Sequence, residues 1–291
     1  MSEVLDWRML NEHVWQDFSM EKDVLNQQRR ALKSRKGITI TTAFYNSGEN
    51  VSGYLDCLTN LDYPKKCVNL LWADNGSTDH TKRLLSDFLK KNGLDYHSVK
   101  LVDVPRLSQT EKKDLQIANV MNSLFEQANT DIINIDSDII FPSDSIHKLL
   151  LMNRTYVANI CSGITAFIIP EKGRLVPVIN AFSFDSVGGR LVNVGQSFVD
   201  ENGFAHFPFM KIEVDSCSFA LCFIEKWVLK RLKCHLNSCD HNLPLCVDIR
   251  FCLDAKSLGF RVMIDTSLYY IHPTLSHKVQ IHENSIDIRC T

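Results

Sequence analysis

Apolar positions between residues 38 and 151 switch repeatedly between the two-residue period of strands and the three-to-four-residue period of helices. Short runs rich in Ile, Val and Leu end in turn residues, and a longer segment of helical character follows each run. The pattern predicts strands at 38–44, 68–73, 99–104 and 131–135, and helices at 50–61, 110–128, 143–151 and from a cap at Ser77 or Thr78 to Lys91. Strands that alternate with helices in this way favour an α/β fold with a mostly parallel sheet.

Residues 1–36 form a separate segment in which apolar residues recur at spacings of three, four or seven. Charged and amide side chains fill the remaining positions, so we expect a helical extension that packs on the main domain. A partner-binding or membrane-surface helix is the alternative, although the charges are mixed rather than basic. The apolar positions are Trp7, Leu10, Val14, Phe18, Leu25 and Leu32.

The second half of the chain is richer in short β-like runs, with hairpin turns expected at Gly188-Gly189 and Asn202-Gly203. The other elements expected there are helices at 225–233 and 247–258 and a strand at 260–265. We expect the hairpin region to extend the same sheet, so that 37–273 forms one domain and 274–291 forms a C-terminal tail.

Composition and charge narrow the classes of protein. The chain has 291 residues, of which 45% are hydrophobic and 23% charged, and its net charge of −2 provides no basic field for nucleic acid. No apolar run approaches the ~18 residues of a transmembrane segment, and the N-terminus lacks a secretory signal. Ten cysteines without such a signal favour a reducing, cytoplasmic location, with peripheral membrane contact still open.

Six of the ten cysteines lie between residues 217 and 252, together with His235 and His241. Structural zinc sites usually contain two tight ligand pairs such as C-x2-C, and no pair here is that close. Several of these cysteines have apolar neighbours in the sequence. Buried free thiols are therefore the favoured interpretation, with a zinc site as the weaker one.

Two aspartates, Asp136 and Asp138, directly follow the strand expected at 131–135. Because residues i and i+2 of a strand share a face, the two carboxylates are expected on one side of the chain end. Paired carboxylates suit a hard divalent cation that takes its other ligands from phosphate oxygens and water. A solvated Asp-Ser-Asp turn is the alternative.

Two other expected strand ends, 41–46 and 74–79, also carry polar side chains. Ligands of open α/β sheets bind beyond the carboxyl ends of the strands. The sequence contains neither G-x-G-x-x-G nor G-x-x-x-x-G-K, the glycine-rich motifs that bind phosphate. Carboxylates at the strand ends without such a motif indicate that a metal ion neutralises the phosphate charge.

Three segments, in this order and spacing, resemble glycosyltransferases of the GT-A fold, above all the large family-2-like group, with some likeness to mannosyltransferases of the Anp1/Mnn9 type. They are Ile38–Phe44, Trp72–Thr81 and Asp136-Ser137-Asp138, which stands at the family's DXD position. The resemblance covers roughly 37–273. It implies a GT-A, Rossmann-like, mostly parallel central sheet flanked by helices, with the N-terminal helical extension outside it.

The resemblance also implies a metal-dependent transfer of a sugar from a UDP- or GDP-sugar to an acceptor hydroxyl on a glycan, glycolipid or glycoprotein. The expected cation is Mn2+ or Mg2+. The residues implied to bind the nucleotide sugar are Thr42, Ala43, Asp74, Asp79, Asp136, Ser137 and Asp138. The implied metal ligands are Asp136, Asp138 and the late histidine His272, and the implied catalytic base is Asp248, the second acid of the family's Glu-Asp motif.

Two departures from the family pattern leave open the catalytic base and, with it, whether the transfer inverts or retains the configuration of the sugar. The first acid of the Glu-Asp motif is Val247 here, and a later acid is replaced by Arg250. Asp215, in a segment that resembles the family's acceptor region, is the competing base, and Asp248 can instead cap a helix. His272 can likewise serve only to end a strand.

Two other functions remain as alternatives. A nucleotidylyltransferase has a similar sheet and metal-bound carboxylates, but it normally carries a basic, glycine-rich loop after the first strand, and Thr41–Gly48 contains no Lys or Arg. A non-catalytic nucleotide-sugar-binding module would keep the fold and lose the base, and Val247 keeps this interpretation open.

Overall fold

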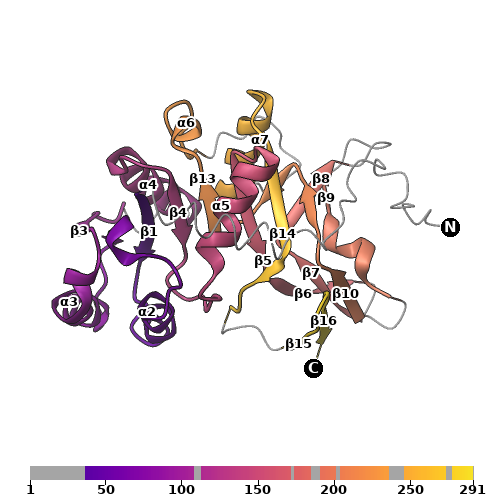
Figure 1. Ribbon diagram of the computed structural model, residues 1–291, viewed down its shortest axis with the longest axis horizontal. Helices are drawn as coiled ribbons and strands as arrows, with labels where there is room; N and C mark the ends of the chain where they lie inside the picture. The colour runs from indigo at the N-terminus through magenta and orange to yellow at the C-terminus, as the bar shows by residue number, and fades with distance from the viewer. Residues whose placement is uncertain are drawn as a thin grey trace.

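The computed structural model describes residues 37–107, 113–171, 174–184, 191–200, 204–235, 246–272 and 277–290. The extension expected at 1–36 lies outside these residues. An eight-stranded sheet forms the centre of the fold (Figure 1). Its strands, in spatial order, are β11 (Lys211–Glu213), β14 (Val262–Tyr269), β5 (Ile160–Ile164), β13 (Leu221–Ile224), β4 (Ile132–Ile135), β1 (Ile38–Phe44), β2 (Val68–Asp74) and β3 (Ser98–Asp103).

The central sheet is mostly parallel, as the alternating pattern predicts. β1 pairs in parallel with β2 and β4, β2 pairs in parallel with β3, and β5 pairs in parallel with β14. β13 is inserted antiparallel between β4 and β5, and β11 is antiparallel at the edge. All residues of β4, β5 and β13 are buried, which explains why they read as continuous apolar runs.

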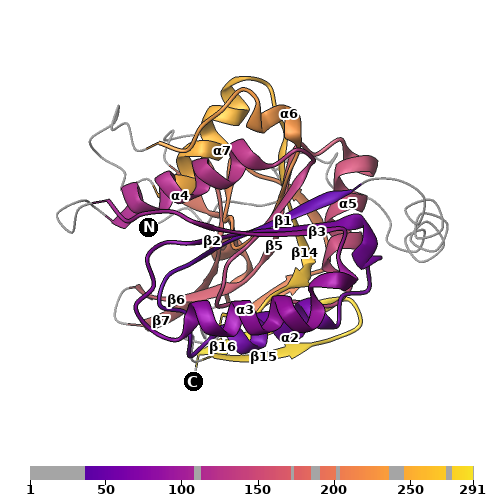
Figure 2. The same cartoon turned by 90° about the vertical axis from the view of Figure 1, so that its left-hand side faces the viewer.

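Helices cover both faces of the central sheet (Figure 2). On one face lie α2 (Val51–Thr59), α3 (Thr81–Asn92) and α5 (Ser145–Tyr156), and on the other lie α4 (Lys113–Gln127) and α7 (Val247–Ser257). The short helices are α6 (Lys226–Leu229), η4 (Lys65–Cys67), η5 (Gly93–Asp95) and η6 (Val194–Phe198). Among the described residues, no helix combines the length and the apolar character needed to cross a membrane.

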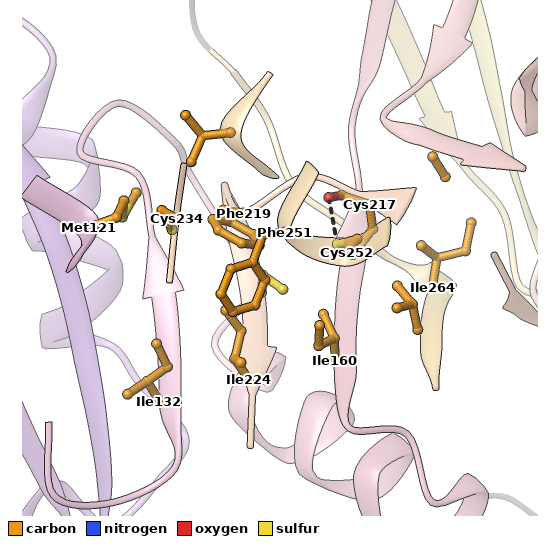
Figure 3. Packing of buried hydrophobic residues seen from close by; sticks show 14 of the residues in the cluster. Met121, Ile132, Ile160, Cys217, Phe219, Ile224, Cys234, Phe251, Cys252 and Ile264 are labelled. Carbon is orange, nitrogen blue, oxygen red and sulfur yellow. Dashed lines mark hydrogen bonds between the residues drawn. The ribbon is translucent and has the colours of Figure 1, made fainter. Parts of the chain in front are cut away.

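Each face of the sheet has its own apolar core. Tyr54 and Trp72 lie in the core beneath α2 and α3, with ring centroids 6.1 Å apart. Phe219 and Phe251 meet edge to face beneath α7, at 5.3 Å (Figure 3). Four thiols of this second core are free and buried, as the sequence predicts, whereas Cys246 is free and exposed. The four buried thiols are those of Cys217, Cys222, Cys234 and Cys252.

The hairpin region forms small separate sheets, so the expectation that it extends the central sheet is wrong for most of its strands. Two of these sheets are β6 (Ala166–Glu171) with β7 (Arg174–Ile179), and β8 (Ala181–Phe184) with β9 (Leu191–Asn193) and β12 (Ser216–Cys217). Within 274–291, where a tail was expected, β15 (His277–Ile281) and β16 (Ser285–Cys290) form a hairpin on β10 (Phe204–Pro208). A two-residue period marks the two faces of a strand, but it does not identify the pairing partner.

The start of α3 also differs from the prediction. The helix begins at Thr81 with His80 at the cap position, so neither Ser77 nor Thr78 caps it. The backbone N–H of Ser77 donates to Asp74, and that of Thr78 donates to Asn46. These bonds hold a loop at the end of β2, where the sequence pattern predicts the first helical turn.

Candidate active site

The carboxyl ends of β1, β2 and β4 lie side by side, because these strands are parallel neighbours in the order β4-β1-β2. Phe44, the last residue of β1, is in register with Asp74, the last residue of β2. The three segments predicted to bind a nucleotide sugar therefore follow neighbouring strand ends. This is the edge at which open α/β sheets bind ligands.

Two predicted nucleotide-binding residues lie within β1. Thr42 is fully buried, and its hydroxyl shares a 2.7 Å hydrogen bond with the hydroxyl of Tyr54. Ala43 is half-buried and packs against the core on the other face. The first exposed ring after them is Tyr45, which the sequence analysis did not single out and which lies 3.7 Å from the guanidinium carbon of Arg106.

Asp74 is buried at the end of β2, and only one of its two carboxylate oxygens has hydrogen-bond partners. Its Oδ2 accepts the backbone N–H groups of Gly76 and Ser77 at 3.1 and 3.0 Å, and Lys82 lies 3.4 Å away. Its Oδ1 is buried without a hydrogen-bond partner. A buried oxygen in this state is costly, which agrees with the expectation that Asp74 binds a ligand, and that role stays a prediction.

Asp79 connects two loops of the site. One of its oxygens accepts the N–H of Gly48 at 3.0 Å, and the other accepts the N–H and hydroxyl of Thr81. The hydroxyl bond from Thr81 is the main cause that lowers the pKa of Asp79. Both oxygens have partners within the protein, so Asp79 shapes the loops after β1 and β2.

The Asp136-Ser137-Asp138 segment is a turn, because β4 ends at Ile135. The two aspartates were expected on one side of the chain because alternate residues of a strand share a face. That reasoning is wrong here, because neither aspartate belongs to the strand. The turn is held by other contacts: the N–H of Asp136 donates to the carbonyl of Ala220 at 2.9 Å, and the hydroxyls of Ser137 and Ser47 are 2.9 Å apart. The second of these bonds ties the turn to the loop after β1.

Asp136 lies among other acidic groups. Burial raises the pKa of Asp136 to about 7, and the charges of Asp138 and Asp248 add to this effect. The amide of Asn134 gives weak support at 3.4 Å. The charges of Asp138 and Asp248 thus act on Asp136 at the carboxyl end of β4, and either a proton on Asp136 or a cation would relieve their repulsion.

His272 reaches this acidic group because of an irregularity in β14. Along the β5–β14 pair, Ile264 is opposite Ser162 but Tyr269 is opposite Ile164, so β14 bulges between these two positions. Beyond the bulge, Ile140 and Ile271 exchange backbone hydrogen bonds of 2.9 and 2.8 Å. This isolated bridge brings the segment after β14 against the segment that follows Asp138.

The resulting pair joins Nε2 of His272 to Oδ2 of Asp138 at 3.1 Å. Two neighbouring ligands of an octahedral ion, each at about 2.1 Å, would lie about 3 Å apart, so this pair fits a divalent cation. Within the described ranges, no group of three or more His, Cys, Asp or Glu side chains is arranged to hold a metal. Further ligands would therefore have to come from a bound diphosphate and water.

Asp248 is the second residue of α7, and Cys246 occupies the N-cap position. Its Oδ1 accepts the N–H of Ile249 at 2.8 Å. Burial is the main cause that raises the pKa of Asp248, and hydrogen bonds from Ile249, Phe219 and Ser218 oppose it. The charge of Asp248 contributes to the raised pKa of Asp136, so the first turn of α7 is near enough to the Asp136-Ser137-Asp138 turn for the two charges to interact.

Val247 and Arg250, the two positions at which the chain departs from the family's Glu-Asp motif, contact other parts of the protein. Val247 is buried in the core beneath α7, and Arg250 forms an ion pair with Asp254 at 3.0 Å. Asp215, the competing base, has both oxygens engaged, one by Lys256 at 2.7 Å and the other by the N–H of Phe184 at 2.8 Å. The geometry therefore brings Asp248, rather than Asp215, into the acidic group.

Three polar residues in this part of the fold, Asn134, Ser218 and Tyr270, were not predicted from the sequence. Asn134 is fully buried within β4, where its amide donates to the carbonyl of Phe219 at 2.8 Å. Tyr270, which follows β14, is buried in the core beneath α2, α3 and α5, and Ser218 follows β12. An amide inside the apolar run Ile132–Ile135 was the available signal for Asn134, because a buried strand position rarely carries an amide without a partner.

A family model for "Glycosyl transferase family 2" matches residues 39–202, more than half of the 291-residue chain. Among curated proteins, the poly-beta-1,6-N-acetyl-D-glucosamine synthase of Staphylococcus epidermidis is 32% identical over 111 residues. That alignment covers 38% of this chain and 24% of the synthase, so it spans about a quarter of the relative's length.

Solved structures show the same fold at low sequence identity. The mannosyltransferase PcManGT from Pyrobaculum calidifontis, in complex with GDP-Man and Mn2+, has a TM-score of 0.55 and 14% identity, over 86% of this chain and 63% of that one. S. aureus TarS 1–349 in complex with UDP-GlcNAc has a TM-score of 0.50 and 16% identity, over 81% and 58%. With the family match and the mostly parallel sheet flanked by helices, the chain belongs to glycosyl transferase family 2 and has the GT-A fold.

Proposed function

We propose that this protein is a metal-dependent glycosyltransferase that moves a sugar from a UDP- or GDP-sugar to a hydroxyl of a glycan, glycolipid or glycoprotein. The observation that carries the proposal is the convergence of Asp136, Asp138, Asp248 and His272 at the carboxyl end of β4. A cation would relieve the repulsion between these carboxylates, and the donor of a glycosyl transfer brings a diphosphate that can pair with the same cation.

The donor would lie across the ends of β1, β2 and β4. The unsatisfied Oδ1 of Asp74 would accept a hydrogen bond from the nucleoside, and Tyr45 with Arg106 provides an exposed ring and a cation beside it. Asp138 and His272 would hold Mn2+ or Mg2+, with Asp136 next to them. When bound, the ion would act as a Lewis acid on the diphosphate as the bond from sugar to phosphate breaks.

Asp248 would remove the proton from the acceptor hydroxyl. Its position in the first turn of α7 favours the ionised carboxylate, because the N-terminus of a helix carries a partial positive charge. Burial opposes this by raising the pKa of Asp248, and a base with a raised pKa accepts a proton more readily than an ordinary aspartate. The acceptor oxygen then attacks the sugar, the proton stays on Asp248, and the nucleoside diphosphate leaves.

The test is a thermal-shift and product-release screen of the full chain with UDP-GlcNAc, GDP-mannose and other nucleotide sugars, each with and without Mn2+. A ligand present at ~100 times its Kd stabilises a protein by about 2.7 kcal/mol, which raises Tm by about 5–10 °C at this size. We expect one donor to do this in the presence of Mn2+ and to release its nucleoside diphosphate.

Two outcomes would contradict the proposal. Binding of a donor without any release of nucleoside diphosphate, even with saturated acceptor mixtures, would favour a binding module. Release of pyrophosphate from a nucleoside triphosphate and a sugar phosphate would instead identify a nucleotidylyltransferase. Asp138→Ala is the control, because it removes a proposed metal ligand and leaves the turn's backbone in place.

A further inference from the structure

Three loops meet at the edge of the central sheet where β5 and β14 begin and β13 ends. The backbone N–H of Glu225 donates to the carbonyl of Asn159 at 2.9 Å, and the N–H of Asn159 donates to the carbonyl of Arg261 at 3.0 Å. The side chain of Asn159 repeats both links, donating to Oε2 of Glu225 at 2.7 Å and accepting the N–H of Arg261 at 2.9 Å. Ile224, the last residue of β13, is opposite Ile132, the first residue of β4. This edge is therefore at the opposite end of the strands from the candidate active site.

The three loops present large apolar side chains to solvent. The exposed fractions are 65% for Val157, 57% for Trp227 and 50% for Leu258. A single exposed apolar side chain is common on a protein surface, but three on loops joined by hydrogen bonds form a patch. The helix α6, which contains Trp227, lies at the top of the molecule in both ribbon views (Figures 1 and 2).

Basic side chains lie beside the ring of Trp227. Nζ of Lys230 is 5.1 Å from the centre of this ring, and the guanidinium carbon of Arg231 is 5.5 Å from it. Arg231 is also 5.9 Å from the ring centre of Phe260, so it links the loop after β13 to the loop before β14. Within the described part of the chain, neither Lys230 nor Arg231 forms an ion pair.

The acidic groups nearby do not cancel this charge. Glu225 is next to Lys226 in the chain, and Glu213 is paired with Arg261 at 2.8 Å. Acid and base are therefore balanced around the patch, and the two cations beside the Trp227 ring remain in excess. The patch is thus basic, although the whole chain has a net charge of −2.

Val157 has an unfavourable backbone conformation. It ends α5 with φ 54° and ψ 38°, in the left-handed region. Glycine is the usual residue in this conformation after a helix, and a β-branched residue is strained there. Because the side chain of Val157 is exposed, its burial within the protein does not offset this strain. Strain of this kind indicates a function for the residue.

We propose that this surface binds a membrane that contains anionic lipids. Tryptophan rings favour the interface between headgroups and acyl chains, aliphatic side chains enter the acyl boundary, and Lys and Arg pair with lipid phosphates. An acidic protein would match the cations, and a nucleic acid would need a far more basic surface, but a membrane also takes up the exposed aliphatic side chains and the ring. The surface lies away from the proposed donor site, so membrane binding does not depend on the proposed function. It consists of Val157, Trp227, Lys230, Arg231, Leu258 and Phe260.

The test is sedimentation of the full chain with vesicles of phosphatidylcholine alone and of equal parts of phosphatidylcholine and phosphatidylglycerol. We expect binding to the anionic vesicles only. The protein should be released as the ionic strength rises from about 0.1 to about 1 M, because the Debye length falls from ~10 to ~3 Å. Trp227→Ala should weaken binding about tenfold, since half of a large aromatic side chain is no longer buried. Replacing both Lys230 and Arg231 by glutamine should weaken it about 25-fold, because each cation near an anionic surface contributes about fivefold.

Val157→Gly separates the function of this side chain from its effect on the fold. Glycine adopts the left-handed conformation without strain, so the variant should have a Tm about 1–4 °C above that of the parent. Loss of the side chain should weaken vesicle binding about threefold. Damage to the fold cannot explain weaker binding in a variant that is more stable than the parent.

Leu94→Ala is the matched control. Leu94 is 88% exposed, and it precedes β3 at the other edge of the sheet, so this variant should bind vesicles as the parent does. Every variant should keep the thermal shift that a donor causes, because the candidate active site lies at the opposite end of the strands.

Three results would overturn the proposal. The first is equal binding to neutral and anionic vesicles, or binding to neither. The second is binding at the level of the parent by Trp227→Ala and by the Lys230→Gln/Arg231→Gln double variant, because the membrane contact would then lie elsewhere in the chain. The third is a dimer in analytical ultracentrifugation that Trp227→Ala dissociates, which would assign this surface to a second copy of the chain.

Discussion

Replacing Asp136 by asparagine should have opposite effects on stability and on function. Asp136 begins the Asp136-Ser137-Asp138 turn, where a half-buried carboxylate would help to bind the donor but destabilises the folded protein when it is ionised. Burial and two neighbouring carboxylates raise the pKa of Asp136 from 3.8 to about 7. A carboxyl with a raised pKa binds more protons in the folded than in the unfolded state between these two values. Its contribution to stability is therefore greatest at low pH and is lost as pH rises through this window.

The magnitude follows from the same shift. About three pKa units at 1.36 kcal/mol each give a ceiling of about 4 kcal/mol, and the partial exposure of Asp136 reduces this by half or more, to about 1–2 kcal/mol. Asparagine has a similar shape and no charge. We expect Asp136→Asn to be more stable than the parent by about 1–2 kcal/mol at pH 8 and to show little difference near pH 4.

Urea unfolding at pH 4, 6 and 8, analysed with a common m-value, measures this difference. Asp87→Asn, at an exposed helix position, is the control and should follow the parent at each pH. The same Asp136→Asn protein should lose metal-dependent binding of the donor in calorimetry. A variant whose stability differs from the parent by the same amount at all three pH values would refute the claim that Asp136 is forced to ionise against its surroundings.

Four further variants test the other assignments. Asp138→Ala should abolish Mn2+-dependent donor binding in calorimetry while the far-UV circular dichroism spectrum stays that of the parent; unchanged affinity would remove the metal site from this turn. His272→Ala should raise the Mn2+ concentration needed for half-maximal activity, and an identical titration would leave His272 with a structural role. Asp248→Asn should lower turnover by about 10²-fold or more with donor affinity kept, the scale of a lost general base. Asp215→Asn should keep most of the turnover, because Lys256 and the N–H of Phe184 already occupy its carboxylate; loss of turnover here alone would transfer the role of base to Asp215.

The sequence predicted the parallel half of the fold well because its signals are local. The apolar runs of β1, β2 and β4 and the turn residues after them locate the strand ends, and with them Asp74 and Asp136. Parallel strands place those ends at one edge without further information. The order of the strands in the second half depends instead on long-range pairing, which a two-residue period does not specify.

The sequence predicts where the candidate site lies better than it predicts the contacts between the residues of that site. That Asp136 and Asp138 follow a strand is visible in the sequence, but the contacts that hold their turn, to Ala220 and Ser47, are not. The approach of His272 to Asp138 depends on a bulge in β14 and on the bridge between Ile140 and Ile271. These contacts join residues far apart in the chain, so no local pattern encodes them.

The antiparallel insertion of β13 has a consequence for how this protein is made. β4 pairs with β1 on one side, and on the other side it must wait for β13, whose first residue, Leu221, follows Ile135 by 86 positions. At a synthesis rate of ~5–20 residues per second, this leaves about 4–17 s during which β4 presents an unpaired, apolar edge on the ribosome. Such edges pair readily with other chains. We expect chains truncated before residue 221 to aggregate, and slow translation of residues 136–224 to increase the demand for chaperones.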